Sequence, residues 1–147
     1  MCDYEIETDL LASQIGEAIH VIRHIHKEDL LLLCEQVYHA NGSIRGHLAI
    51  TPQDLEKLKT MEEHYAIPCR QFVLPQGSIG ACKLHVLRSQ TKKVIRHMHR
   101  IQKERNAPGI LWDYFNRLSN LFFMMALYEN QAEAIEEIPF LSRSYDS

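Results

Sequence analysis

The stretch "FVLPQGSIGACKLHVLRSQTKKVIRH", residues 72–97, decides the fold that we expect for this chain. Its Leu-Pro-x-Gly-Ser turn ends in Ser78, and serine often caps a helix by accepting a backbone N–H bond. The apolar residues that follow recur every three or four positions, which is the spacing of one face of an α-helix. We therefore predict a loop that ends at Gly77 and a long helix that begins at Ser78.

The rest of the sequence also has the spacing of α-helices. The five expected helices span approximately residues 5–25, 28–40, 51–65, 78–104 and 108–139. "TPQD" at 51–54 is a clear start signal, because Thr51 can cap a helix and Pro52 suits its first position. Since no segment alternates like a strand, we expect an all-α, up-and-down five-helix bundle that forms one domain over residues 1–147.

Apolar stripes indicate which helix faces pack inward. On the first helix the stripe consists of Ile6, Leu10, Ile15, Ala18, Ile19 and Ile22. On the fourth it consists of Ile79, Val86, Leu87, Val94, Met98 and Ile101. The other side of the fourth helix carries Arg88, Lys92, Ile95, Arg96 and His99, with His85 one turn earlier. Spacing alone favours a solvated basic face, although cations one turn apart also suit a polyphosphate.

Composition narrows the classes of function. The chain has 147 residues, 46% hydrophobic and 24% charged, which is ordinary for a globular domain. A net charge of -3 argues against a general nucleic-acid or membrane-surface binder. No apolar run approaches the roughly 20 residues of a membrane span, and the acidic N-terminus does not look like a signal peptide. We therefore expect a cytoplasmic protein with reduced cysteines, because its four Cys form no CxxC pair.

Two blocks, "FVLPQGSIGACKLHVLRS" and "YFNRLSNLFFMMALYEN", resemble the PduO-type ATP:cob(I)alamin adenosyltransferases. That family typically reads F-(V/I)-L-P-G-G-S, then A-x-x-L-H-x-A-R-x-x-C-R-R-A-E-R, and later Y-L-N-R-L-S-D-L-L-F. Weaker likeness in "TDLLASQIG" at 8–16 and "AITPQDLEKLK" at 49–59 extends the resemblance over most of the chain.

The resemblance implies a homotrimer of five-helix bundles with active sites between subunits. It implies attack of Co(I) of a reduced cobalamin on C5′ of ATP, with triphosphate as the leaving group and Mg²⁺ bound with the nucleotide. In that family a Phe leads an apolar wall that excludes the lower axial ligand of cobalt. A dry environment of this kind changes the reduction potential of a metal.

Matched position by position, Phe72 takes the ligand-excluding place. Asp9 and Arg88 match an Asp and an Arg that form an intersubunit salt bridge near it, so these three residues form the expected catalytic set. The residues expected to bind the nucleotide and its phosphates are Lys92, Arg96, Asn116, Arg117 and Asn120.

The nucleotide side departs from the family pattern. The phosphate loop T-x-T-G-D-x-G-x-T, which precedes the first helix in the family, has no counterpart in this sequence. C-R-R-A-E-R reads "TKKVIR", so Lys92 replaces an Arg that contacts the nucleotide and Ile95 replaces the Glu. Asn120 replaces the last Asp of N-R-L-S-D. Lysine keeps the charge but not the bidentate fork of arginine.

Two alternatives follow from these departures. The first is a non-catalytic paralogue that binds corrinoid as a carrier, a sensor or a partner subunit, because the corrinoid side is better kept than the nucleotide side. The second is an interaction module that contacts RNA through the basic residues Lys92, Lys93, Arg96, Arg100 and Lys103. The acidic whole and the lack of interleaved aromatics argue against nucleic acid.

Metal and protein partners are the remaining expectations. His20 and His24 are four residues apart, a spacing that can hold zinc, but no nearby Glu or Cys completes a set, so no metal is assigned. The expected ligands are the small-molecule substrates ATP and cobalamin. A reductase or a corrinoid-dependent enzyme is the expected protein partner, and neither nucleic acid nor a membrane is.

Overall fold

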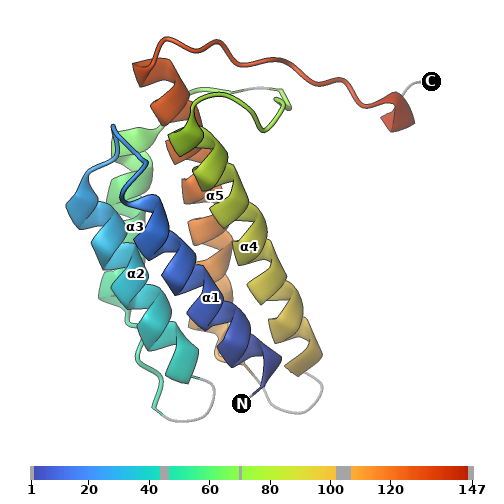
Figure 1. The fold of residues 1–147 in the computed structure, drawn as a ribbon. Coiled ribbons are helices and arrows are strands. Elements are labelled where there is room, and N and C mark those ends of the chain that lie inside the picture. The colour runs from blue at the N-terminus through green and yellow to red at the C-terminus, as the bar shows by residue number, and fades with distance from the viewer. Residues whose placement is uncertain (1, 44–46, 70, 102–106, 146–147) are drawn as a thin grey trace.

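The computed structural model describes residues 2–43, 47–69, 71–101 and 107–145, and in these ranges the chain forms five α-helices (Figure 1). They are α1 (Asp3–Ala18), α2 (Lys27–Gly42), α3 (Pro52–Tyr65), α4 (Ile79–Ile101) and α5 (Gly109–Ala132), followed by the short 3-10 helix η1 (Arg143–Tyr145). The described residues contain no strand, only an isolated bridge between Val73 and Pro139. The expected all-α five-helix fold is confirmed.

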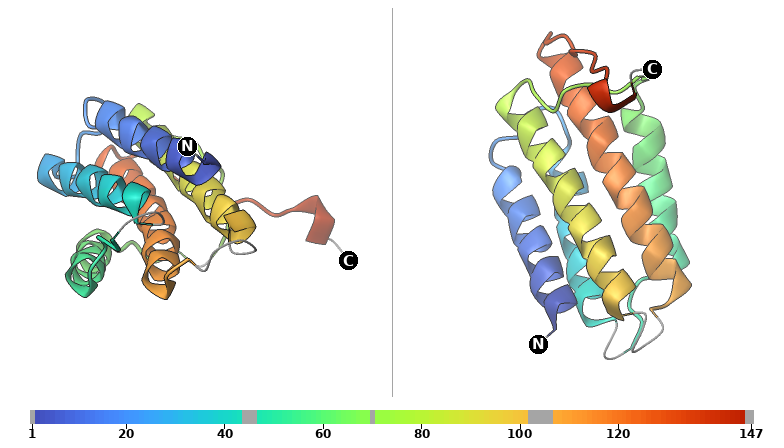
Figure 2. Two further views of the ribbon diagram at one scale, coloured as in Figure 1. Left: turned by 90° about the horizontal axis from the view of Figure 1, so that it is seen from below. Right: turned by 90° about the vertical axis from the view of Figure 1, so that its right-hand side faces the viewer.

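The helices pack side by side along one common direction (Figures 1 and 2). α5 contacts both α3 and α4, and α1 contacts both α2 and α4. Buried aromatic residues fill the centre, and their polar ends find partners: the Tyr4 hydroxyl donates to the Ala40 carbonyl at 2.6 Å, and the Tyr114 hydroxyl to Gln36 Oε1 at 3.0 Å. These bonds remove the penalty of burying two hydroxyls and tie α2 to α1 and α5.

The helix starts follow the local sequence signals. The Ala81 N–H donates to Ser78 Oγ at 3.1 Å, so Ser78 caps α4 as expected. Thr51 caps α3 by accepting from the Asp54 N–H at 3.3 Å, and the Asp54 carboxylate accepts in return from the Thr51 N–H at 2.8 Å. Such a reciprocal capping box satisfies two backbone donors that the helix itself leaves free.

The expectation of a first helix reaching residue 25 is wrong, because α1 ends at Ala18. Ile22 and Ile25 are nonetheless buried, at 4% and 3% exposure, in the connection to α2. That connection is held from a distance: the Glu129 carboxylate on α5 accepts the backbone N–H groups of Arg23 and His24, both at 2.8 Å. Apolar spacing therefore continues past the point where the helix stops.

The expected core face of α4 also needs correction. Ile79 and Val86 are 64% and 52% exposed, whereas His85, expected on the basic side, is 4% exposed. α4 packs against α1 on one side and against α5 on another. The buried part of its surface is therefore wider than the apolar stripe and does not include Val86. On α1, Ile6 and Leu10 are likewise exposed, at 50% and 43%.

Beyond α5 the chain leaves the bundle as an extended segment that runs past the start of α4 and projects from the bundle (Figure 1). It pairs with the loop before α4: the Phe140 N–H donates to the Phe72 carbonyl at 2.8 Å, and the Leu74 N–H to the Ile138 carbonyl at 2.9 Å. The loop that carries Phe72 is thus held by the C-terminal segment. Among the described helices, none is both long and apolar enough to cross a membrane.

Candidate functional site

A pocket of about 420 Å³ lies between the loop before α4, the middle of α4 and the middle of α5. Its lining includes four of the residues singled out in the sequence: Phe72, Arg88, Lys92 and Asn120. Phe72 is 76% exposed and stands at the rim, while Phe123 of α5 supplies a second aromatic wall. The pocket therefore joins an apolar side to two cations, which suits a ligand with a flat organic part and an anionic part.

A second pocket, of about 470 Å³, lies between α3 and α5. Asn116 and Arg117 line it, as does Asn120, which borders both pockets. Arg117 is not free to turn inward, because its Nη1 lies 3.0 Å from Glu62 Oε2 of α3. Asn116 and Asn120 are exposed and lie one helical turn apart, so both side-chain amides face the second pocket. Arg117 instead holds α3 against α5.

Arg88 and His85 form an electrostatically unusual pair beside the first pocket. The Arg88 guanidinium lies 5.9 Å from the centre of the Phe123 ring, within reach of a cation–π contact. Neither nitrogen of the buried His85 ring has a hydrogen-bond partner among the described residues, nor has Arg88 Nε. Burial, and then the charge of Arg88, lowers the pKa of His85 to about 4. His85 therefore stays neutral near pH 7 and leaves the positive charge of the pocket to Arg88 and Lys92.

Asn130, which the sequence analysis did not single out, fixes the turn before α4. It is fully buried; its Oδ1 accepts from the Ser78 N–H at 3.0 Å, and its Nδ2 donates to the Gln76 carbonyl and to Glu137 Oε2, both at 2.9 Å. Gly77 has φ +126°, and a Cβ there would overlap the Asn130 side chain. Only glycine can stand this close to the Asn130 side chain with this backbone conformation. The Pro-Gln-Gly turn and Asn130 together therefore position the segment that carries Phe72.

Asp9 and Arg96 line neither pocket. Both are exposed, and Asp9 accepts a hydrogen bond from the Tyr38 hydroxyl at 3.3 Å; within the chain it makes no salt bridge with Arg88. Lys93, one of the residues named for RNA contact, is paired within the chain, because its Nζ lies 3.2 Å from Glu7 Oε1 of α1. Although burial acts to raise it, hydrogen bonds from Gln90 and Lys93 hold the pKa of Glu7 below its usual value.

The row of cations proposed for RNA contact is accordingly interrupted. With Lys93 paired to α1, the exposed cations that remain in that row are Lys92, Arg96 and Arg100, and Lys103 lies outside the described residues. A short row of this kind, without interleaved aromatic residues, does not resemble a nucleic-acid surface.

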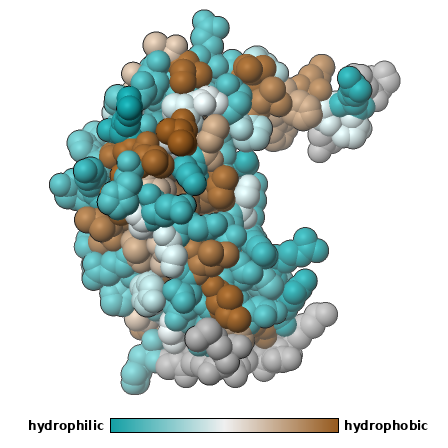
Figure 3. Space-filling model, in the orientation of Figure 1, coloured by the Kyte–Doolittle hydropathy of each residue, from teal (hydrophilic) through white to brown (hydrophobic). Residues whose placement is uncertain are grey.

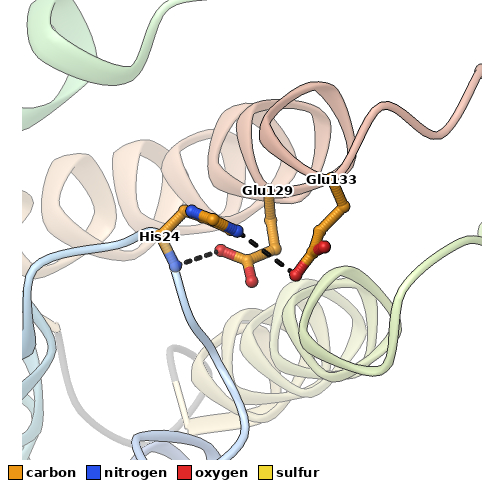
Figure 4. Close-up of side chains that lie close together, drawn as sticks. All are labelled: His24, Glu129 and Glu133. Atoms are coloured by element: carbon orange, nitrogen blue, oxygen red, sulfur yellow. Dashed lines mark hydrogen bonds and ion pairs between the residues drawn. The ribbon is translucent and has the colours of Figure 1, made fainter.

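The fold also assembles a group that sequence spacing could not reveal. His24, Glu129 and Glu133 come together although more than 100 positions separate His24 from the two glutamates (Figure 4). The helical spacing of the two glutamates on α5 was a visible signal, but nothing in the sequence paired it with His24.

Comparison with known proteins places the chain in a family. The sequence model described as Cobalamin adenosyltransferase matches residues 6–129. A corrinoid adenosyltransferase of Bacillus subtilis (strain 168) is 26% identical over 120 residues, a match that covers 76% of this chain and 62% of that relative. The match thus spans less than two thirds of the relative's length.

Solved structures of similar fold include variants of a PduO-type ATP:corrinoid adenosyltransferase from Lactobacillus reuteri. A Phe-to-Ala variant, complexed with cobalamin and ATP, superposes with a TM-score of 0.85 at 21% identity over 95% of this chain and 84% of that one. An Arg-to-Lys variant, complexed with ATP, gives a TM-score of 0.80 at 23% identity over 94% and 85%. At this identity the superpositions establish the fold. Because the family's sequence model spans most of its length, the chain belongs to the cobalamin adenosyltransferase family.

Proposed function

We propose that this protein is a corrinoid adenosyltransferase, which moves the 5′-deoxyadenosyl group of ATP to the Co(I) of a reduced cobalamin. The observation that carries the proposal is the first pocket, where Phe72 from the loop before α4 meets Arg88 and Lys92 midway along the α4–α5 interface. In this reaction the electron pair of Co(I) forms the bond to C5′, the C5′–O bond breaks, and the triphosphate leaves with that bond's electrons.

The apolar side and the cationic side of the pocket would have different roles. Phe72 and Phe123 provide an apolar wall, against which the corrin face would lie with its lower axial ligand excluded. Lys92 lies four residues after Arg88 on the same helix face and would stabilise the negative charge of the triphosphate. This stabilisation matters most in the transition state, when the triphosphate departs. Asn116 and Asn120, with hydrogen-bonding amides, would orient the nucleoside, and Arg96 extends the positive charge outward. Mg²⁺ would accompany the nucleotide phosphates.

Lysine at position 92 is compatible with nucleotide binding. In the Lactobacillus reuteri protein the Phe and the Arg that the variants replace are 20 positions apart, the same separation as Phe72 and Lys92 here. The Arg-to-Lys variant was solved with ATP bound. This parallel supports ATP binding beside Lys92, with the monodentate geometry of an ammonium group in place of the arginine fork.

A homotrimer would complete the site. A corrin ring with its substituents is larger than either pocket, so one chain does not enclose it. Exposed apolar residues lie on two neighbouring helices, Ile6 and Leu10 on α1 and Ile79 and Val86 on α4, and Figure 3 shows apolar patches on the face where α1 lies. Burial of such a face between copies is favourable. It would also allow Asp9 of one subunit to form the expected salt bridge with Arg88 of the next.

The function is tested by incubating the protein anaerobically with chemically reduced cobalamin and MgATP. We expect adenosylcobalamin and triphosphate in equal amounts. Lys92→Arg should retain the activity, and Lys92→Ala should raise the KM for ATP at least about tenfold, since one charge-assisted contact contributes about 1.5–3 kcal/mol. Failure of the wild-type protein to form adenosylcobalamin, with cobalamin still bound, would favour the second candidate function.

That second candidate is a corrinoid carrier or sensor without catalysis. The replacement of the family's Glu by Ile95 and of its Asp by Asn120 favours it, because both remove carboxylate acceptors from the nucleotide side. The two candidates differ in their use of ATP. A transferase binds ATP and corrinoid together, whereas a carrier binds corrinoid with an affinity that does not change when ATP is added.

A further inference from the structure

Outside the two pockets, one cluster of side chains combines an imidazole with two carboxylates. His24, in the connection after α1, and Glu129 and Glu133, one turn apart near the end of α5, bring their side chains close together (Figure 4). All three donor atoms lie within 4.8 Å of one another, and His24 Nε2 is 3.2 Å from Glu133 Oε1. No residue of this cluster lines the pocket that holds Phe72 and Arg88.

The buried member of the cluster is fixed before any ligand arrives. Glu129 is 1% exposed, and its two oxygens accept the backbone N–H groups of Arg23 and His24, both at 2.8 Å. Each carboxylate oxygen can accept at least one further interaction, so these bonds orient the group without exhausting it. Gly80 leaves room for this carboxylate, since a Cβ there would stand 2.7 Å from Glu129 Oε2.

The other two members are open on the solvent side. The side chains of His24 and Glu133 are 36% and 28% exposed, so water can complete a coordination shell. Tetrahedral zinc with bonds of about 2.1 Å places its donors about 3.4 Å apart, close to the 3.2 Å between His24 Nε2 and Glu133 Oε1. The other donor separations, which are at most 4.8 Å, can shorten because the side chains of His24 and Glu133 are both partly exposed.

We propose that His24, Glu129 and Glu133 form a binding site for a divalent zinc-class metal ion. One imidazole nitrogen and two carboxylates make a mixed donor set that suits Zn²⁺ and its first-row neighbours better than Mg²⁺ or Ca²⁺, which prefer all-oxygen shells. Two carboxylates close together also favour a dication. Arg23, which lies 3.7 Å from Glu133, is 75% exposed, so its side chain can turn into solvent when a metal binds.

The position of this site gives a bound metal a structural effect. It would add metal–ligand bonds to the hydrogen bonds and ion pairs that already join the connection after α1 to Glu129 and Glu133 of α5. Asn130, the next residue after Glu129, holds the turn that carries Phe72 into the first pocket. Metal binding would therefore stiffen the end of the bundle from which Phe72 extends.

The test uses Co²⁺, whose visible absorption reports its coordination, titrated into metal-free full-length protein, with Zn²⁺ competition to follow. We expect one saturable equivalent that Zn²⁺ displaces. Glu133→Gln keeps the shape and the hydrogen bond of the glutamate but removes its charge, and His24→Ala removes the imidazole. Loss of an outer-shell partner typically weakens metal binding 10–100-fold, so loss of a direct ligand should raise the Kd at least about tenfold in each variant.

A matched control comes from an exposed histidine and glutamate elsewhere. His39 lies 3.6 Å from Glu35 on α2, so His39→Ala removes a comparable pair and should leave the Co²⁺ titration unchanged. The absorption does not depend on corrinoid turnover, and the outcome is therefore independent of the proposed function. Absence of saturable Co²⁺ binding, or equal binding by wild type, Glu133→Gln and His24→Ala, would overturn the proposal.

Discussion

Acidification should weaken the fold through His85. The ring is 4% exposed without a hydrogen-bond partner among the described residues, and burial lowers its pKa from 6.5 to about 4. Between these values the unfolded chain binds a proton that the folded chain does not, so stability falls as the pH drops below 6.5. Well above pH 6.5 the ring is neutral in both states, and its contribution to the pH dependence vanishes.

The expected size follows from the two pKa values. At pH 5 an unfolded-state pKa of 6.5 and a folded-state pKa of about 4 destabilise the fold by about 2 kcal/mol, against about 0.2 kcal/mol at pH 7. Urea unfolding of wild type and His85→Leu at both pH values isolates this effect. Wild type should lose about 2 kcal/mol more than His85→Leu between pH 7 and 5, and the exposed-site control His39→Ala should behave as wild type. Equal losses in wild type and His85→Leu would show that the ring is not desolvated as described.

Three further substitutions probe the site. Phe72→Ala should depress adenosylation strongly but change the free energy of unfolding by less than about 0.5 kcal/mol, because the ring is 76% exposed; turnover and urea unfolding measure the two effects. Arg88→Ala should lower turnover and weaken the proposed trimer together, the second effect being measured by sedimentation, whereas a fully active trimeric variant would show that Asp9 and Arg88 do not pair between subunits. Asn130→Ala should cost about 2–4 kcal/mol in urea unfolding, since three hydrogen bonds of about 1 kcal/mol each are lost, one of them leaving the Ser78 N–H unpaired, and corrinoid affinity should fall with it. Its exposed neighbour control, Gln131→Ala, should stay within about 0.5 kcal/mol of wild type.

Local signals predicted the helix starts, because a cap needs only residues three or four positions apart. Thr51 and Ser78 are both caps in the structure. The connection after α1 is held by a distant group, the Glu129 carboxylate on α5, and no pattern around Ala18 indicates this contact. The periodicity of Ile19, Ile22 and Ile25 continues because these residues remain buried after the helical backbone has stopped.

Part of the candidate site could be predicted from two sources, the family pattern and the residues that share one face of the fourth helix. Arg88 and Lys92 share a helix face, and the resemblance added Phe72 and Asn120; all four line one pocket. A helical wheel does not reveal how many neighbours a helix has, so the burial of His85 was missed. The contacts of Asn130 with Ser78 and Gln76, and of His24 with the α5 glutamates, join residues more than 50 positions apart, which only the folded chain brings together.

The proposed transferase reaction is tested by an anaerobic absorbance titration of the protein with cob(II)alamin, with and without ATP. We expect the spectrum of Co(II) lacking its lower ligand to appear when ATP is present, and added reductant then to yield adenosylcobalamin. Phe72→Ala should reduce that spectral change. Corrinoid binding with the same spectrum whether or not ATP is added would contradict the account and leave the protein a corrinoid binder without the transferase reaction.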